Sequence, residues 1–224
     1  SSSRVELLYC GSAEEQRVED AVQSALAALP RGHQDELPPV EQVAAPSQPR
    51  FINETMDVTQ GKLAVGYRCT SKDYPAMVLA NLIFGGTSNS KLFLNVREKL
   101  SLCYYASSSY ARSKNILTVS SGVETGSRDR ALEEIDRQLK AVQTGDWEDW
   151  EQEGALQAIR SSLLSLSDSQ GALENFYLGQ IASGVHETPE ELAAELERVT
   201  KGRIVAAART VHLDTVYFLG GRDA

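Results

Sequence analysis

The stretch GGTSNSKLFLNVREKLSLCYYASS, residues 85–108, changes secondary structure twice within a short length of chain. Its opening residues 85–88, Gly-Gly-Thr-Ser, are typical of a helix end followed by a new N-cap. Residues 91–100 follow with apolar side chains at helical spacing, namely Leu92, Phe93, Val96 and Leu100. From Cys103 the pattern becomes the alternation of a β-strand. The stretch therefore predicts a helix end, a second helix and a strand in direct succession.

From Cys103 to the end of the chain, the sequence predicts three strands and several more helices. In chain order these are a strand over 103–111, a turn over 112–115, a strand over 116–123, a helix from Ser127 to Gly145, a helical stretch over 147–183 broken near 167–171, helices capped by Thr188 and Thr200, and a closing strand over 213–220. Thr188-Pro189-Glu190-Glu191 is the clearest helix start, because it combines an N-cap, a proline at N1 and a glutamate at N3.

Upstream of residue 85, the pattern predicts a helix over 73–84 and two strands with a turn at Gln60-Gly61. These strands cover 51–58 and 62–69. Residues 30–50 are rich in proline and lack periodicity, so we expect a linker or a long surface excursion there. Val5–Tyr9 predicts a strand, and Ser12 with Glu15 predicts a capping box that begins a helix.

The order of these elements predicts the fold class. Hairpin-forming strands and grouped helices favour an α+β fold, with an antiparallel or mixed sheet and helices packed on one face. The chain of 224 residues is long enough to bury a core of its own. It begins at Ser1 without a methionine, so we expect it to be processed or excised from something longer.

Composition excludes several classes of partner. The 22 Lys and Arg residues against 31 Asp and Glu residues give a net charge of −9, which repels nucleic-acid phosphates. No apolar run approaches the ~18 residues of a membrane span. The cysteines, Cys10, Cys69 and Cys103, are odd in number and widely spaced, so they predict neither a disulfide framework nor a zinc clamp. We therefore expect a reducing, cytoplasmic location.

Residues that could carry catalysis are scarce. His33-Gln34-Asp35-Glu36-Leu37 nearly matches the inverted zinc motif H-x-x-E-H, but Leu37 replaces the second histidine and the prolines that follow stop a helix. His186 and His212 each have an acidic neighbour but no third ligand near in sequence. No G-x-S-x-G elbow is present. We therefore expect no metal site, no cofactor and no catalytic residue in this chain.

The stretch 85–108 resembles the second-half domain of the pitrilysin and mitochondrial-processing-peptidase family of zinc peptidases. The shared features are the Gly-Gly turn, the small residues before Leu-Phe, the Arg-Glu-Lys triplet and the tyrosine that opens a strand of small residues. Ser101 stands where the family usually has glycine, and Lys91 where it usually has arginine. Weaker matches flank this stretch, at residues 5–29, Asp73 with Pro75, 188–192 and 214–217.

The resemblance implies one half, residues 1–224, of a clam shell built from two half-domains of similar fold, with residues 30–50 as its linker or excursion. The other half, in the same or a neighbouring chain, would carry the zinc. Arg97 and Tyr104 match the family's pair of residues that bind the substrate peptide. Both side chains are hydrogen-bond donors suited to a peptide carbonyl or its oxyanion. From the residues alone, a solvated helix arginine and a half-buried strand tyrosine stay open.

Three functional hypotheses follow. In the first, the chain is the non-catalytic, substrate-binding half of a zinc metallopeptidase and closes over a peptide held by a catalytic half. In the second, it is a binding or scaffold subunit of a pair without proteolytic activity. The third, a freestanding hydrolase of another class, lacks a nucleophile and base pair in this sequence. The first two share a fold, so the fold cannot separate them.

Overall fold

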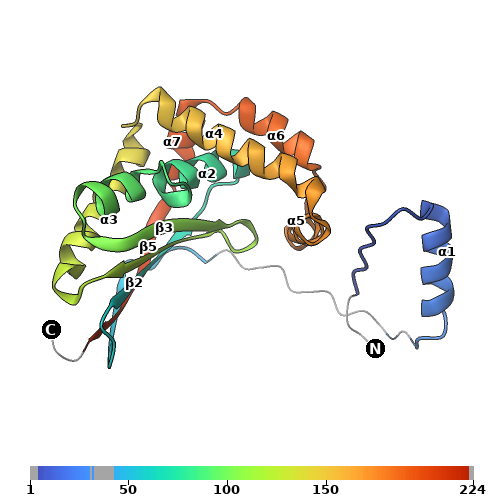
Figure 1. Ribbon diagram of the computed structural model, residues 1–224, viewed down its shortest axis with the longest axis horizontal. Coiled ribbons are helices and arrows are strands. Elements are labelled where there is room, and N and C mark those ends of the chain that lie inside the picture. The colour runs from blue at the N-terminus through green and yellow to red at the C-terminus, as the bar shows by residue number, and fades with distance from the viewer. Residues whose placement is uncertain (1–4, 31, 33–42, 222–224) are drawn as a thin grey trace.

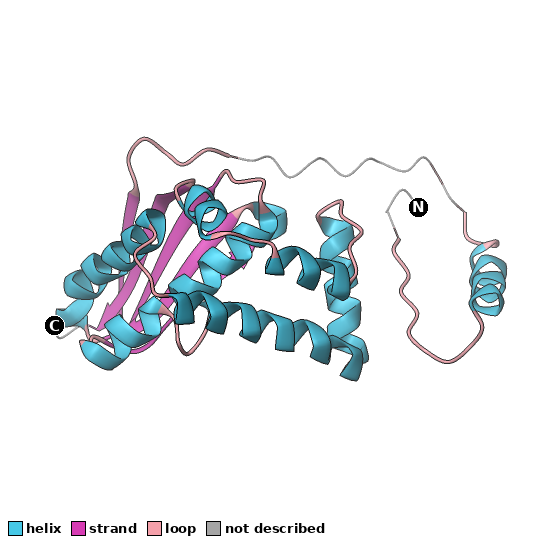
Figure 2. Ribbon diagram, turned by 90° about the horizontal axis from the view of Figure 1, so that it is seen from above, coloured by secondary structure: helices cyan, strands magenta, loops and turns pink. Residues whose placement is uncertain are grey.

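The computed structural model describes residues 5–30, 32 and 43–221, and its body is a sheet with helices on one face (Figures 1 and 2). The five strands have the order β1-β5-β2-β4-β3. Their bounds are β1 Arg50–Met56, β2 Gly61–Cys69, β3 Cys103–Ala111, β4 Ile116–Val123 and β5 Val211–Gly221. β1 is parallel to β5, and all other neighbours are antiparallel. The predicted mixed α+β fold is therefore confirmed.

The helices of the body follow the predicted order. They are α2 Tyr74–Asn81, η1 Leu82–Gly86, η2 Leu92–Lys99, η3 Arg112–Lys114, η4 Thr125–Ser127, α3 Arg128–Thr144, α4 Asp149–Leu164, η5 Ser165–Asp168, α5 Gln170–Ala182, α6 Pro189–Glu197 and α7 Lys201–Ala208. The predicted break near 167–171 is confirmed between α4 and α5. η1 and η2 are wound more widely than an α-helix, with π-helical turns.

Thr188 and Gly145 cap helices as the sequence predicts, whereas Ser127 at the start of α3 makes no side-chain capping hydrogen bond. The Thr188 hydroxyl accepts from the Glu191 amide, and the Glu191 carboxylate accepts from the Thr188 amide, which completes the capping box. Gly145 ends α3 with a φ of 80°, a conformation that favours glycine. The Asp73 carboxylate caps α2 and also forms two 2.8 Å hydrogen bonds with the Arg203 guanidinium, so it ties α2 to α7.

The hydrophobic core lies between the sheet and the helices. Alternate residues of β2 are buried against the helices, namely Leu63, Val65, Tyr67 and Cys69. The residues between them start with Lys62 and Ala64, which are exposed on the opposite face of the sheet. In Figure 1 the helices lie above the sheet and leave this lower face uncovered. The sheet is thus half-buried, as its alternation requires.

One predicted neighbour relation is wrong. The strands on either side of Gln60-Gly61 do not form a hairpin, because β5 lies between β1 and β2. Every residue of β1 is exposed, whereas β5 buries Val216 and Phe218, so β5 gains more from the interior position. The connection from β1 to β2 passes over the end of β5. There the carbonyl oxygen of Val58 would lie 2.7 Å from a Cβ atom on Gly221.

The beginning of the chain also differs from the prediction. Val5–Tyr9 forms no strand, and α1 spans Glu15–Leu26 with Glu14 as an N-cap that makes no side-chain hydrogen bond. The predicted capping box at Ser12 is therefore wrong. No residue of α1 is buried, and Figures 1 and 2 show the helix standing apart from the body. Most of the predicted excursion over 30–50 lies outside the described residues.

Candidate functional site

The end of η2 and the start of β3 form one corner of the body. The chain reverses there through hydrogen bonds from the Ser101 amide to the Arg97 carbonyl (3.1 Å) and from the Leu102 amide to the Val96 carbonyl (3.0 Å). Ser101 has a φ of 49°, the left-handed region that glycine adopts without strain. This turn places Arg97 on the last turn of η2 and Tyr104 at the start of β3.

The Arg97 side chain is held loosely at this corner. Its guanidinium carbon lies 4.7 Å from the centre of the Phe93 ring, which is a cation–π arrangement. Its Nε lies 3.6 Å from a carboxylate oxygen of Glu98. The side chain is 41% exposed, so donors of the guanidinium, which carries five N–H groups, remain accessible to solvent. Arg97 is therefore half-buried, with its charged end beside Phe93 and partly open to a ligand.

Tyr104 lies at an irregularity of the edge strand. Cys103 pairs with Val123 and Tyr105 with Gly122, which leaves Tyr104 as the extra residue of a β-bulge. It is 78% exposed, whereas Ala106 and Ser108 are buried against the helices. Regular alternation would place Tyr104 on the same face as Ala106 and Ser108, but at the bulge its side chain faces solvent. Its phenol is available to a ligand.

Cys103 directly precedes Tyr104 in the chain, and the charge of Arg97 acts on its thiol. Burial raises the pKa of its thiol, and a hydrogen bond with the Ser121 hydroxyl and the positive charge of Arg97 partly oppose that rise in pKa. The Ser121 hydroxyl also donates to the Tyr105 carbonyl at 2.8 Å, which holds the backbone next to the bulge.

A buried polar network lies beneath η2. The ammonium of Lys91 is 3.1 Å from the Glu151 carboxylate of α4, and the two side chains are 10% and 8% exposed. The Asn95 amide donates to the Lys91 carbonyl (3.0 Å) and to the side-chain oxygen of Gln138 on α3 (3.1 Å). Sequence reasoning missed this network because its partners are far apart in the chain. The one sequence feature that could have indicated a buried charge is the position of Lys91 directly before the apolar residue Leu92.

The histidines that the sequence analysis considered as metal ligands lie in separate parts of the chain. His186 lies in the connection between α5 and α6, and His212 lies exposed at the start of β5. His33 is outside the described residues, and within them no group of three or more His, Cys, Asp or Glu side chains could hold a metal ion. Of the helices in the described part of the chain, none has the length and apolar content that crossing a bilayer requires.

Comparisons with known proteins agree with this fold. The family model described as "Peptidase M16 inactive domain" matches residues 1–159. A Bacillus subtilis protein named "Probable inactive metalloprotease YmfF" is 40% identical over 180 residues, which cover 79% of this chain and 42% of that protein. The chain spans about half the length of the curated relatives it matches.

Solved structures show the same architecture. The crystal structure of a conserved protein from Enterococcus faecalis V583 has a TM-score of 0.84 and 27% identity, over 95% of this chain and 51% of that one. The peptidase M16 inactive domain from Pseudomonas fluorescens has a TM-score of 0.76 and 19% identity, over 95% of this chain and 52% of that one, which shows the shared fold. The chain belongs to the family of peptidase M16 inactive domains, and its curated relatives are named as zinc proteases or as a probable inactive metalloprotease.

Proposed function

We propose that this chain is the non-catalytic half of a zinc metallopeptidase and that it binds the substrate peptide across from a zinc-bearing half. The observation that carries the proposal is the corner at which the side chains of Arg97 and Tyr104 both reach solvent, with exposed fractions of 41% and 78%. Both side chains carry hydrogen-bond donors, which recognition of a peptide carbonyl requires.

The two side chains would donate different hydrogen bonds to the substrate. The Arg97 guanidinium can donate two parallel hydrogen bonds to peptide carbonyls or to a carboxylate, and its stacking on Phe93 limits the freedom lost on binding. The Tyr104 hydroxyl can donate one hydrogen bond to a carbonyl or to the oxyanion that forms during cleavage. The metal and the attacking water would belong to the other half, because the described residues of this chain contain no group of metal ligands.

Reconstitution with the zinc-bearing half tests the proposal. We expect cleavage of a fluorogenic peptide to require both halves, and Arg97→Ala to lower kcat/KM by about 10²-fold. Arg130→Ala, which removes an exposed arginine of α3, is the matched control and should stay within about twofold of wild type. Equal kcat/KM values for wild type and Arg97→Ala would remove the proposed role of Arg97.

One comparison favours the alternative of a scaffold pair without proteolysis. The Bacillus subtilis relative that is 40% identical is named a probable inactive metalloprotease. In that case the corner would still bind peptide, but the assembled pair would not cleave it. Binding of a labelled peptide that Arg97→Ala weakens, without cleavage in the presence of added zinc, would support this second function over the first.

We further propose a cytoplasmic location. Cys10 is exposed, Cys69 is buried and Cys103 is half-buried, and all three are free thiols. Free cysteines are typical of a reducing compartment. Fractionation of cells that express the tagged, natural full-length protein tests this, and recovery outside the cytoplasm would contradict it.

A further inference from the structure

Two adjoining cavities lie between the end of α5, the turn from β3 to β4 and the start of α2. Their volumes are about 380 Å³ and 260 Å³, and they share the lining residues Tyr74, Arg112, Ser113 and Ser183, so we treat them together as the α5 cavity. In Figure 1 the turn between β3 and β4 points toward α5. β3 runs from Cys103 to Ala111, so roughly 25 Å, at about 3.3 Å per residue, separates this cavity from the corner that carries Tyr104.

The wall of the cavity that the turn forms is held firmly in place. The Tyr110 hydroxyl donates to the side-chain oxygen of Asn115 at 2.6 Å, and the Cys69 amide donates to the Asn115 carbonyl at 2.9 Å. The guanidinium carbon of Arg112 lies 3.8 Å from the centre of the Tyr74 ring. This stacking fixes the plane of the guanidinium without using its N–H donors.

The same wall carries positive charge that the protein does not fully neutralise. Arg112 lies 3.4 Å from the Glu187 carboxylate, longer than the about 2.7–2.9 Å of a strong charge-assisted hydrogen bond, and its guanidinium makes no second hydrogen bond with a described residue. Lys72 is exposed, lines the cavity and forms no ion pair within the described part of the chain. Of the described residues that line the cavity, none is acidic, although the chain carries a net charge of −9. This wall therefore favours an anionic ligand.

The opposite wall, formed by α5, offers acceptors. Gln180 lines the smaller cavity and is 6% exposed, and its side-chain oxygen is buried with no hydrogen-bond partner among the described residues. A buried acceptor of this kind is rare, and a bound donor would satisfy it. α5 also ends at this place, with Ala182 and Ser183 lining the larger cavity, and the carbonyl end of a helix is the negative end of its dipole. This wall therefore favours an N–H group.

We infer that the α5 cavity binds the C-terminal residue of a peptide, with its carboxylate at Arg112 and Lys72 and its backbone N–H toward Gln180. The last residue of a peptide carries both groups on one Cα, so it can meet the cationic wall and the accepting wall together. The rings of Tyr74 and Phe176 line the cavity and offer apolar contact to its side chain. The inference goes beyond the proposed function, because it concerns binding by this chain alone and requires no cleavage.

The test uses the full chain and a pentapeptide of glycine, serine and alanine that ends in phenylalanine and carries a fluorophore at its N-terminus. By fluorescence anisotropy, the peptide with a free carboxylate should bind at least about tenfold more tightly than its C-terminal amide. Arg112→Gln should weaken binding of the free acid by about tenfold or more. Lys114→Gln removes the same charge from the same turn at a residue outside the lining of the cavity, and it should change the Kd by less than about twofold.

Gln180→Leu tests the accepting wall. The substitution removes the buried acceptor and keeps a side chain of similar size, so it should weaken binding of the free acid by about threefold or more. The Tm should stay the same or rise, because a buried acceptor without a partner is lost from the folded state. A lower Tm with an unchanged Kd would show that Gln180 has only a structural role and would overturn its part in binding.

Three further outcomes would overturn the inference. The first is an equal Kd for the free acid and the amide, or equal weakening by Arg112→Gln and Lys114→Gln. The second is an amidated peptide ending in glutamate that binds as tightly as the free acid, which would assign the cavity to side-chain carboxylates. The third is displacement of the peptide by an equal concentration of inorganic phosphate, which would assign it to anions in general.

These outcomes also separate the cavity from the peptidase role. If the free acid binds as expected and the wild-type pair of halves cleaves no peptide, the cavity stands and the proposed proteolysis is wrong. If cleavage depends on Arg97 while Arg112→Gln binds the free acid like wild type, the peptidase role stands and the assignment of the cavity is wrong.

Discussion

Gly85, at the end of the helical segment that follows α2, lies directly against Ser108 of β3. A Cβ atom on Gly85 would be 2.7 Å from the Ser108 hydroxyl oxygen, 2.8 Å from the Ser108 backbone nitrogen and 2.6 Å from a methyl carbon of Leu92. Two of these three atoms belong to the strand and one to the next helix. The absence of a side chain at residue 85 is therefore what lets the predicted succession of helix, helix and strand pack as one unit.

Gly85→Ala should destabilise the body for this reason. The methyl group would meet the Ser108 backbone nitrogen, which cannot rotate away, and overpacking of this kind costs about 1–3 kcal/mol of unfolding free energy. Gly154→Ala is the matched control, because a Cβ atom on Gly154 of α4 meets nothing within 4 Å. Alanine there should add about 0.5–1 kcal/mol. Urea unfolding of both variants measures the effects, and equal stability for the two would contradict the packing argument.

Ser101→Gly should stabilise the corner that carries Arg97 and Tyr104. Serine at a φ of 49° carries a steric cost of roughly 1–2 kcal/mol, which glycine avoids, and the greater freedom of glycine in the unfolded chain offsets part of the gain. A net gain of about 0.5–1 kcal/mol corresponds to a rise in Tm of about 2 °C.

The control for that prediction is the same substitution in extended backbone. Ser107→Gly, at an exposed position in the middle of β3, should lower the unfolding free energy by about 0.5–1 kcal/mol. A fall in Tm for Ser101→Gly would show that the left-handed turn is not strained.

Most elements of the body could be predicted from the sequence, because their signals are local. The capping box at Thr188, the glycine at residue 145 and the alternation over 62–69 each depend on a few neighbouring residues. The position of β5 between β1 and β2 could not be predicted. Strand order depends on which strand gains most from double pairing, and that comparison involves residues far apart in the chain.

The candidate site was predicted only in part. The family resemblance named Arg97 and Tyr104, and the structure places both at one exposed corner, where their binding role stays a prediction. Strict alternation would have put Tyr104 on the face of Ala106, and the bulge that changes this leaves no local signal in the sequence. The ion pair of Lys91 with Glu151 was missed because pairing across sixty residues has no periodic pattern.

The carboxylate of Asp214 should make stability depend on acid pH. Hydrogen bonds from the Thr215 hydroxyl and from the guanidinium groups of Arg50 and Arg68 hold the pKa of Asp214 well below its ordinary value. The folded state therefore favours the ionised form. The stabilisation is complete above the unfolded pKa of about 3.9 and is lost as the pH falls below it towards the folded pKa.

Asp214→Asn should remove that dependence. We expect about 2 kcal/mol less unfolding free energy at pH 7, below the ~3–5 kcal/mol of a fully buried pair because the Arg50 side chain is 65% exposed. The loss of stability from about pH 4 to about pH 2 should become shallower. Asp136→Asn on α3, where the carboxylate is 54% exposed beside Lys140, is the control and should change stability by less than about 0.5 kcal/mol. A wild-type acid slope in Asp214→Asn would refute the assignment.

Tyr104→Phe, assayed with the zinc-bearing half, separates substrate anchoring from stabilisation of the transition state. The substitution removes one O–H donor from a side chain that is 78% exposed, so the Tm should stay within about 1 °C of wild type. If the wild-type hydroxyl donates to the oxyanion, kcat of Tyr104→Phe should fall by about 10²–10³-fold. If the hydroxyl only anchors the peptide, the substitution should raise KM and leave kcat unchanged.

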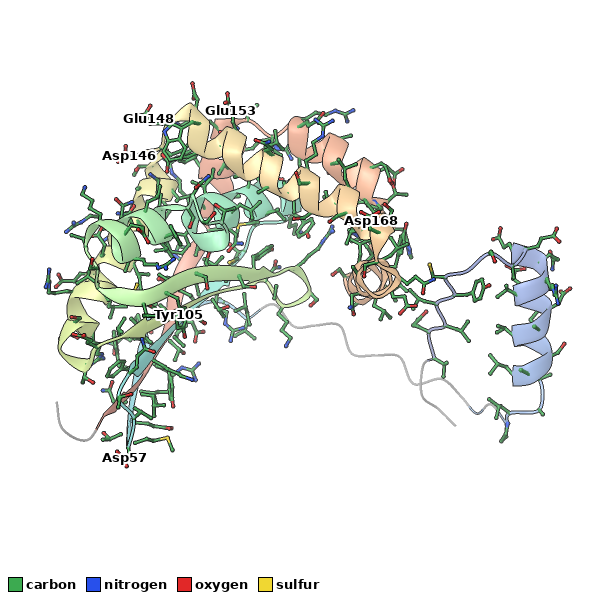
Figure 3. The ribbon with its side chains drawn as sticks, viewed as in Figure 1. Asp57, Tyr105, Asp146, Glu148, Glu153 and Asp168 are labelled. Atoms are coloured by element: carbon green, nitrogen blue, oxygen red, sulfur yellow. The ribbon has the colours of Figure 1, made fainter. Side chains whose placement is uncertain are left out.

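Tyr105→Phe is the matched control. Its ring packs beside Gly122, and Figure 3 shows the residue on the side of the sheet away from the helices. Removal of that hydroxyl should leave both constants within about twofold of wild type. If Tyr104→Phe and Tyr105→Phe have the same kcat and KM as wild type, the exposed phenol at the bulge takes no part in binding, and Arg97 alone would remain as the candidate contact of this corner with the substrate.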